Sequence, residues 1–222
     1  MSRHLVRINA PRTWQIPRKS ITFITKPHGS HPTELSLPLL IILRDILHYA
    51  GNAREAKKLA LNEEILVDGK RVKDIKRSIG LFDILSIPKI KEHYRIFINR
   101  HGKVSLQKSI EEKLKPCKII GKTLVNGKIQ LNLHDGNNIF ADNSYKVGDT
   151  VVLELPSKKI LHHFKLEKGS TVYITGGKHI GDTGKIESIS DSIVCKNNES
   201  QVFIMPKYYA FVLGKEKSVI TI

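Results

Sequence analysis

Apolar residues recur at helical spacing in one stretch of the chain, residues 36–62. In the first half of this stretch they lie three and four residues apart, which predicts a helix with one buried face. The positions are Leu39, Leu43, Ile46, Leu47 and Ala50. Ser36 and Pro38 are typical of the start of such a helix, and Gly51 is typical of its end.

A second helix is predicted from about Ala53 to Asn62, where Asn52 and Glu55 have the spacing of a capping box. One narrow face of this helix is apolar. Another face carries three cations at helical spacing, Arg54, Lys57 and Lys58. Cations placed in this way repel one another by about 0.2–0.5 kcal/mol per pair, and phosphate groups nearby would reverse that cost. A merely solvated face is the alternative.

The rest of the chain has the pattern of short strands separated by turn residues. Asp68-Gly69 predicts a hairpin within residues 65–72, and Asn126-Gly127 predicts another between strands at 117–125 and 128–133. Single strands are predicted at 81–87, 94–98, 103–106, 138–141, 150–155, 171–174, 184–189, 192–196, 201–205 and 210–213. Residues 107–114 are compatible with a short helix.

The fold class that follows is α+β. Two helices and a small sheet form one module, and a central β domain follows it. The last five predicted strands occupy about fifty residues, which suits a small SH3-like β-barrel at the C-terminal end.

The first 36 residues are predicted to form an extended basic arm. Four prolines discourage a long helix, and Arg3, Arg7 and Arg12 are spread along the segment. An arm of this kind can lie along a phosphate backbone. Trp14 has two interpretations: it stacks on a base, or it is an anchor in the protein core.

The charge of the chain points to a partner. Its 222 residues include 37 Lys and Arg against 21 Asp and Glu, a net charge of +16. The excess is distributed along most of the chain, which favours several contacts to one large anion, and nucleic acid is the common anion of that size. A solvated, lysine-rich surface is the alternative. The longest apolar run, residues 37–43, is far shorter than a membrane span, and no signal peptide is predicted.

Patterns for catalysis or metal binding are weak. The glycine-rich stretch 176–184 has predicted strands on both sides, whereas a phosphate-binding loop needs a strand before it and a helix after it. His162 and His163 are adjacent and would point to opposite faces of a strand. Cys117 and Cys195 lack the spacing of a zinc site or a disulfide framework. We therefore predict no catalytic residue, no metal, no cofactor and no small-molecule substrate.

Several motifs occur in the order in which one protein family has them. They are His4-Leu5-Val6-Arg7, Ala10-Pro11-Arg12 with Trp14, Leu37-Pro38-Leu39-Leu40 with Leu43-Arg44, Asp68-Gly69-Lys70, the stretch from Gly80 to Ile87, and Phe211-Val212-Leu213-Gly214-Lys215. Together they resemble the eukaryotic and archaeal type of small-subunit ribosomal protein four over most of the chain. The basic C-terminal extension of eukaryotic members is not seen, which favours the archaeal type.

The resemblance implies four segments: a basic N-terminal arm (1–36), an α-L RNA-binding domain (37–98), the family's central β domain (99–166) and a KOW module with an SH3-like barrel (167–222). It also implies a non-catalytic, structural component of the small ribosomal subunit that takes part in translation in the cytoplasm. Its partners would be small-subunit rRNA and neighbouring small-subunit ribosomal proteins, with no membrane. Carried onto this chain, the RNA-binding candidates are Arg3, Arg7, Arg12, Arg54, Lys57, Lys58, Lys70, Arg71, Lys73 and Lys178.

Two other functions share parts of this pattern. RNA-modifying enzymes such as pseudouridine synthases carry the same RNA-binding motif, but they need a large catalytic domain, and about 120 residues of small β modules follow the motif here. An accessory factor built around the KOW barrel, such as a transcription-elongation factor, is the second alternative. Such a factor would be substoichiometric and released by salt, whereas a structural component is present once per subunit.

Overall fold

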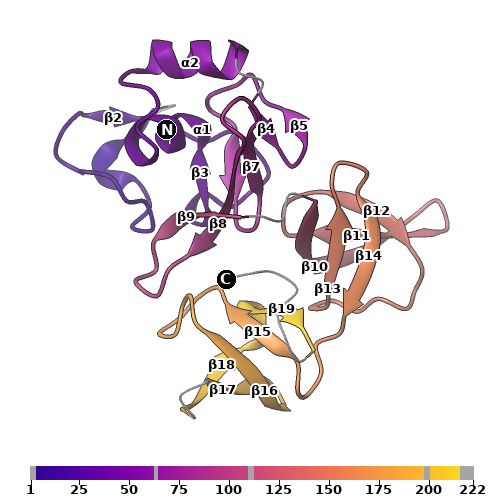
Figure 1. Cartoon of the computed structure of the whole chain (residues 1–222). Coiled ribbons are helices and arrows are strands. Elements are labelled where there is room, and N and C mark those ends of the chain that lie inside the picture. The colour runs from indigo at the N-terminus through magenta and orange to yellow at the C-terminus, as the bar shows by residue number, and fades with distance from the viewer. Residues whose placement is uncertain (1–3, 63–64, 110–112, 198–200, 216–222) are drawn as a thin grey trace. The chain divides into compact units, whose positions relative to one another are not determined.

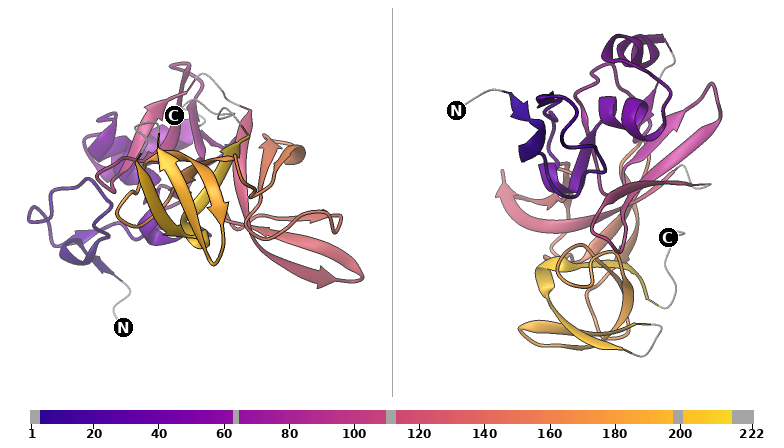
Figure 2. Two further views of the ribbon diagram at one scale, coloured as in Figure 1. Left: turned by 90° about the horizontal axis from the view of Figure 1, so that it is seen from below. Right: turned by 90° about the vertical axis from the view of Figure 1, so that its left-hand side faces the viewer.

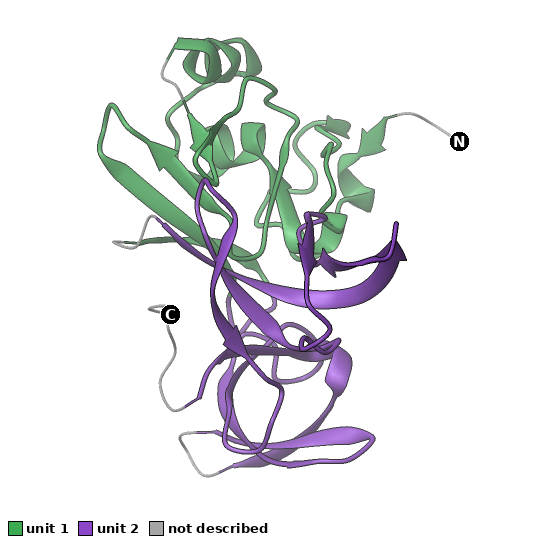
Figure 3. Cartoon of the chain, turned by 90° about the vertical axis from the view of Figure 1, so that its right-hand side faces the viewer, with its two compact units in different colours: residues 1–98, 103–112 green, residues 99–102, 113–222 purple. Residues whose placement is uncertain are grey.

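The computed structural model describes residues 4–62, 65–109, 113–197 and 201–215, shown in Figure 1. These residues belong to two compact units. Unit 1 spans residues 1–98 and 103–112, and unit 2 spans residues 99–102 and 113–222, as coloured in Figure 3.

The described residues of unit 1 form two α-helices and nine short strands. The helices are α1 (Leu39–Ile41), which continues into a π-helical turn (Ile42–Ile46), and α2 (Ala53–Asn62). The strands are β1 (Leu5–Val6), β2 (Phe23–Ile24), β3 (Ser36–Pro38), β4 (Leu66–Val67), β5 (Lys70–Arg71), β6 (Ser78–Gly80), β7 (Ile84–Ile87), β8 (Glu92–Ile98) and β9 (Val104–Lys108). The main sheet has the order β5-β4-β7-β8-β9, while β1 pairs with β2 and β3 with β6.

The second predicted helix is confirmed as α2, but the first is shorter than predicted. Its start is also different, because Ser36 lies in β3 instead of capping the helix. At His48 the backbone adopts φ = 54°, and the N–H groups of Tyr49 and Ala50 both donate to the carbonyl of Leu43. The helix therefore ends well before Gly51.

The predicted N-terminal arm packs against the core of unit 1. Ala10, Trp14 and Ile24 belong to the same apolar cluster as the residues of α1. Trp14 is 1% exposed, and its Nε1–H donates to the carbonyl of Thr33 at 3.1 Å. Of the two interpretations of Trp14, the structure supports the core anchor.

The described residues of unit 2 form two five-stranded antiparallel sheets. The strands of the first are β10 (Leu114–Val125), β11 (Lys128–Leu133), β12 (Asn138–Ala141), β13 (Thr150–Glu154) and β14 (Lys159–Phe164), in the order β12-β11-β10-β13-β14. The strands of the second are β15 (Thr171–Ile174), β16 (Thr183–Ile189), β17 (Ser192–Asn197), β18 (Val202–Pro206) and β19 (Ala210–Gly214), in the order β18-β17-β16-β15-β19.

The long strand β10 changes its partner along its length. Its first half pairs with β13, and its second half pairs with β11 through the predicted Asn126-Gly127 hairpin. Figure 2 shows this hairpin extending as a long two-stranded ribbon. The prediction of a short helix at 107–114 is wrong at both ends of that range, since β9 continues to Lys108 and β10 begins at Leu114. Residues 110–112 lie outside the described part.

All five strands predicted near the C-terminal end are confirmed. Among the described residues β18 and β19 lie at opposite edges of their sheet and do not pair, so the module is a half-barrel instead of a closed barrel. The glycine-rich turn between β15 and β16 is structural: Gly181 has φ = 81°, and a Cβ there would lie 2.5 Å from the backbone of Asn99. Only glycine fits such a position without strain.

Lys118 joins the two sheets of unit 2. From β10, its Nζ donates to the carbonyls of Lys207, Tyr208 and Ala210 at 3.2, 2.8 and 2.7 Å, around the start of β19. Burial lowers the pKa of this amine to about 8. The sequence does not indicate this role, because a lysine at a strand position is typical of a solvated face.

Candidate nucleic-acid interface

Helix α2 presents its cations to solvent. Ala56 and Ala60 are buried on one side, so that Arg54, Lys57 and Lys58 are exposed on the other. Asn52 and Glu55 cap the N-terminal end of the helix, because the side chain of each accepts a backbone N–H. The N–H of Glu55 donates to Asn52 Oδ1 at 3.0 Å, and Glu55 Oε2 accepts the N–H of Gly51 at 2.7 Å. Capping of this kind satisfies backbone N–H groups at the start of the helix and stabilises it there.

The loop that leads into α2 is attached to the main sheet. Glu92 at the start of β8 accepts hydrogen bonds from Lys108, Tyr49 and Tyr94. These three donors, Lys108 first, lower the pKa of Glu92 to about 2. Because Tyr49 lies three residues before the cap of α2, this cluster fixes the start of the helix relative to β8 and β9.

The β4–β5 hairpin places further cations beside the helix. Asp68 and Gly69 have φ values of 52° and 73°. A two-residue type I′ hairpin turn requires positive φ at both of these positions. Lys70 and Arg71 follow on β5 and are exposed, and Lys73 is exposed just after it. Arg71 donates to the carbonyl of Leu61 at 2.7 Å and so joins the hairpin to the last turn of α2, which Figure 1 shows beside it.

We call Arg54, Lys57, Lys58, Lys70, Arg71 and Lys73 the α2–hairpin cations. Within the described residues, none of Arg54, Lys57, Lys58, Lys70 and Lys73 forms an ion pair. Lys76 and Arg77 are exposed and extend the same basic stretch. Apart from Arg71, the α2–hairpin cations therefore have positive charge that no carboxylate in the described part neutralises, and Arg71 links the two elements.

The N-terminal candidates do not form one group. Arg3 lies outside the described residues, and Arg12 is exposed. Arg7 is 3% exposed and donates to the carbonyl of Pro17 at 2.9 Å, so the structure argues against a contact between Arg7 and phosphate. Arg18 also points inward and donates to the carbonyls of Ile8, Ala10 and Pro11. A basic segment folded on itself satisfies its backbone carbonyls with its own arginines, and the charge pattern alone does not reveal this.

Lys178 belongs to unit 2, whereas the α2–hairpin cations belong to unit 1. It is exposed on the turn between β15 and β16. Its neighbour His179 stacks on Phe203 with ring centroids 4.7 Å apart. The stacking holds the turn against the half-barrel and leaves Lys178 directed to solvent.

The described residues contain no group of three or more His, Cys, Asp or Glu side chains that could hold a metal ion. Among the same residues, no helix has the length and apolar character needed to cross a bilayer.

Comparison with known proteins relates this chain to one family. Residues 90–160 match the family model described as Ribosomal family S4e, residues 1–34 match the RS4NT (NUC023) domain and residues 168–204 match the KOW motif. The chain is 41% identical to the small ribosomal subunit protein eS4 of Methanococcus maripaludis, over 99% of this chain and 97% of the relative. It is 43% identical to the protein of the same name from Methanocaldococcus jannaschii, over 98% of this chain and 96% of the relative.

A solved structure agrees with this relationship. The crystal structure of the 30S ribosomal protein S4e from Thermoplasma acidophilum superposes with a TM-score of 0.69 at 33% identity, covering 83% of this chain and 96% of that one. With relatives above 40% identity along almost its full length, the chain belongs to the S4e family of small-subunit ribosomal proteins.

Proposed function

We propose that this chain is a structural, non-catalytic constituent of the small ribosomal subunit and binds its rRNA through the α2–hairpin cations. The observation that carries the proposal is a set of exposed cations on two elements that Arg71 ties together, five of which form no ion pair within the described residues: Arg54, Lys57, Lys58, Lys70 and Lys73. Membership of the S4e family supports the same function. The protein would then act in translation, in the ribosomes of the cytoplasm.

Binding of this kind depends on phosphates and on the shape of the RNA. Side chains cannot read the deep major groove of an RNA helix, so a rigid basic surface recognises the backbone and its geometry. Each neutralised phosphate releases counterions, which makes the affinity fall steeply as salt rises. The fixed positions of α2 and the hairpin reduce the conformational entropy lost on binding.

The chain would also contact neighbouring small-subunit proteins. Val202 and Ile204 on the edge strand β18 are 59% and 69% exposed, side by side on the outward face of the half-barrel. An apolar strand face favours a protein neighbour. Lys178 and Arg12 are the further candidates for contact with rRNA outside the α2–hairpin cations.

The salt dependence of rRNA binding tests the proposal. We expect Lys57→Ala with Lys58→Ala to weaken binding to a small-subunit rRNA transcript. The fall of log K with log salt should also become less steep, its slope decreasing in magnitude by about 1.5, the contribution of two phosphates. Alanine is the strongest helix former, so α2 should remain intact. The measurement is filter binding at several salt concentrations, with circular dichroism to verify the fold.

Lys89→Ala with Lys91→Ala is the charge-matched control. Both residues are exposed in the turn between β7 and β8, in the same unit. We expect a smaller change in slope for this pair. Equal slopes for the Lys57/Lys58 variant and the parent would remove α2 from the interface.

A further inference from the structure

The sheet made by β10, β11 and β12 has one face that packs a core and one that faces outward. Leu131 and Leu133 of β11 point into the core together with Cys117 and Ile119. Side chains alternate along a strand, so the residues between them point outward. The register places Thr123, Gln130 and Phe140 in one outward row and Gly121, Asn132 and Asn138 in the next.

Phe140 is unusual on this outward face. It is 59% exposed, and it makes no ring contact within the described residues. Of the seven Phe of the chain, only one other, Phe23, is more than half exposed, and its ring contacts His4. A partner molecule that covered this ring would gain the free energy of burying apolar surface.

The other side chains in these two rows are neutral hydrogen-bonding groups. Gln130 is its direct cross-strand partner, and Gln130 Nε2 donates to Asn132 Oδ1 at 3.1 Å. This contact leaves the amide oxygen of Gln130 and the amide nitrogen of Asn132 available on the same face. Gly121 lacks a side chain and leaves that part of the face open, with only the Asn132 amide within 4 Å of where its Cβ would be.

We propose that Phe140 is a stacking platform for an unpaired base of the rRNA, with the amides of Gln130 and Asn132 beside it for the edge of that base. Aromatic rings with nearby hydrogen-bonding groups are how proteins hold bases that are not in a helix. The inference rests on the proposed function, since it takes rRNA as the partner. It adds a second kind of contact, because the two rows contain no charged side chain and stacking is not a phosphate contact.

Substitutions at Phe140 separate stacking from other contacts. We expect Phe140→Ala to weaken binding of the full chain to a small-subunit rRNA transcript by about tenfold, in the range found for one stacked base. Phe140→Trp should bind like the parent, because it keeps an aromatic face. Phe140→Leu should bind like Phe140→Ala, because it keeps the apolar bulk and loses the ring. All three variants should keep the parental salt slope.

Leu124→Ala is the control for loss of an exposed apolar side chain. Leu124 is 75% exposed on β10 of the same sheet but points to the other face of that sheet, and its loss should leave binding unchanged. Two results would overturn the inference. The first is that Phe140→Ala binds like the parent. The second is that Phe140→Leu binds like the parent, which would indicate an apolar contact such as one with a protein neighbour. Either result would leave the parental salt slope and the Lys57/Lys58 effect intact. Failure of the proposed function would instead abolish salt-dependent binding by the parent itself, and the inference about Phe140 would fall with it.

Discussion

Replacing Lys115 by alanine is expected to lower the free energy of unfolding of unit 2 by about 3–5 kcal/mol, the cost of breaking a buried ion pair. Lys115 Nζ lies 2.9 Å from Asp135 Oδ2, and both side chains are only 1% exposed. Without the ammonium group, the carboxylate of Asp135 would remain buried with no compensating charge on that side. Chemical denaturation followed by circular dichroism measures the loss.

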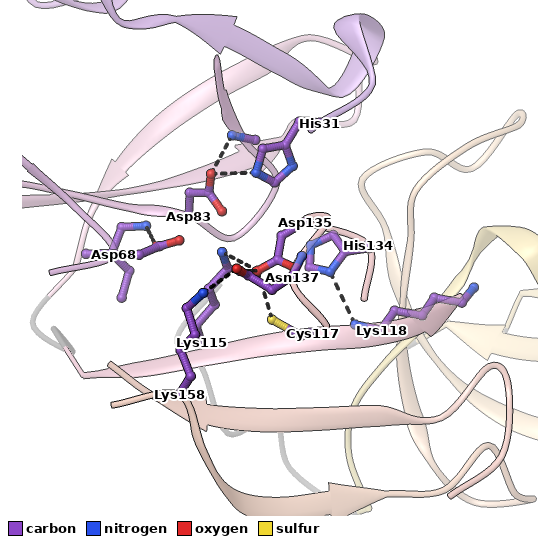
Figure 4. A network of polar contacts seen from close by, with 12 residues as sticks. His31, Asp68, Asp83, Lys115, Cys117, Lys118, His134, Asp135, Asn137 and Lys158 are labelled. Atoms are coloured by element: carbon purple, nitrogen blue, oxygen red, sulfur yellow. Dashed lines mark hydrogen bonds and ion pairs between the residues drawn. The ribbon is translucent and has the colours of Figure 1, made fainter. Parts of the chain in front are cut away.

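The surroundings of Asp135 explain why the effect should be large. Asp135 also accepts hydrogen bonds from the backbone N–H of Asn137 at 2.9 Å, from the side-chain amide of Asn137 at 2.6 Å and from the thiol of Cys117 at 3.6 Å. Figure 4 shows these side chains around Asp135. Burial alone would raise the pKa of this carboxyl, but Lys115, His134 and the Asn137 N–H hold the pKa well below its ordinary value of 3.8. Above its unfolded pKa, Asp135 therefore contributes to the stability of the folded state. This contribution is lost as the pH falls from the unfolded pKa towards the lower pKa of the folded state.

Two variants make this expectation specific. Lys115→Met with Asp135→Leu should recover part of the loss and should remove part of the acid sensitivity, because no charge remains to be buried. Recovery should be incomplete, because the N–H and the amide of Asn137 lose their acceptor. Lys122→Ala, at a half-exposed position of the same strand β10, should change the stability by no more than about 0.5 kcal/mol. A loss below about 1 kcal/mol for Lys115→Ala would contradict the role of the pair.

Trp14→Ala is expected to lower the free energy of unfolding of unit 1 by about 3–5 kcal/mol, because it opens a large cavity in the core. The ring lies in the same cluster as Leu37 and Leu39, and its indole N–H is bonded to Thr33. Thermal and chemical unfolding of the full chain, followed with a probe in unit 1, measures the loss.

Trp14→Phe keeps an aromatic ring and loses the hydrogen bond, so we expect a smaller loss, of about 1–2 kcal/mol. This variant keeps the prediction testable if the alanine variant does not fold. If Trp14→Ala kept its stability and instead bound rRNA more weakly, the ring would be a base-stacking residue, and its assignment to the core would be wrong.

The elements predicted from local chemistry agree best with the structure. The Asp68-Gly69 and Asn126-Gly127 turns, the five C-terminal strands and the capped helix α2 are all set by neighbouring residues, and all are confirmed. The α2–hairpin cations are exposed for the same reason, since the apolar residues of α2 determine which of its faces is buried. Their contact with rRNA stays a prediction.

Features that depend on distant residues could not be predicted. The first helix stops early at His48, whose backbone is left-handed, and the next residue, Tyr49, is held by Glu92 and Tyr94, more than forty residues away in the chain. Arg7 is buried because the N-terminal segment folds onto unit 1 and its own carbonyls accept the guanidinium. Lys118 is a structural residue because β10 meets the start of β19 and the residues just before it, a contact that no local pattern contains.

Lysine reactivity in the assembled subunit tests the central claim most directly. The measurement compares amine modification of each lysine, quantified by mass spectrometry, in the free chain and in salt-washed small subunits. We predict that Lys57, Lys58, Lys70 and Lys73 react in the free chain, where all four are exposed, and are protected in the subunit until the RNA is digested. Equal reactivity of these four lysines in both states would contradict the claim that α2 and the hairpin form the surface that binds rRNA.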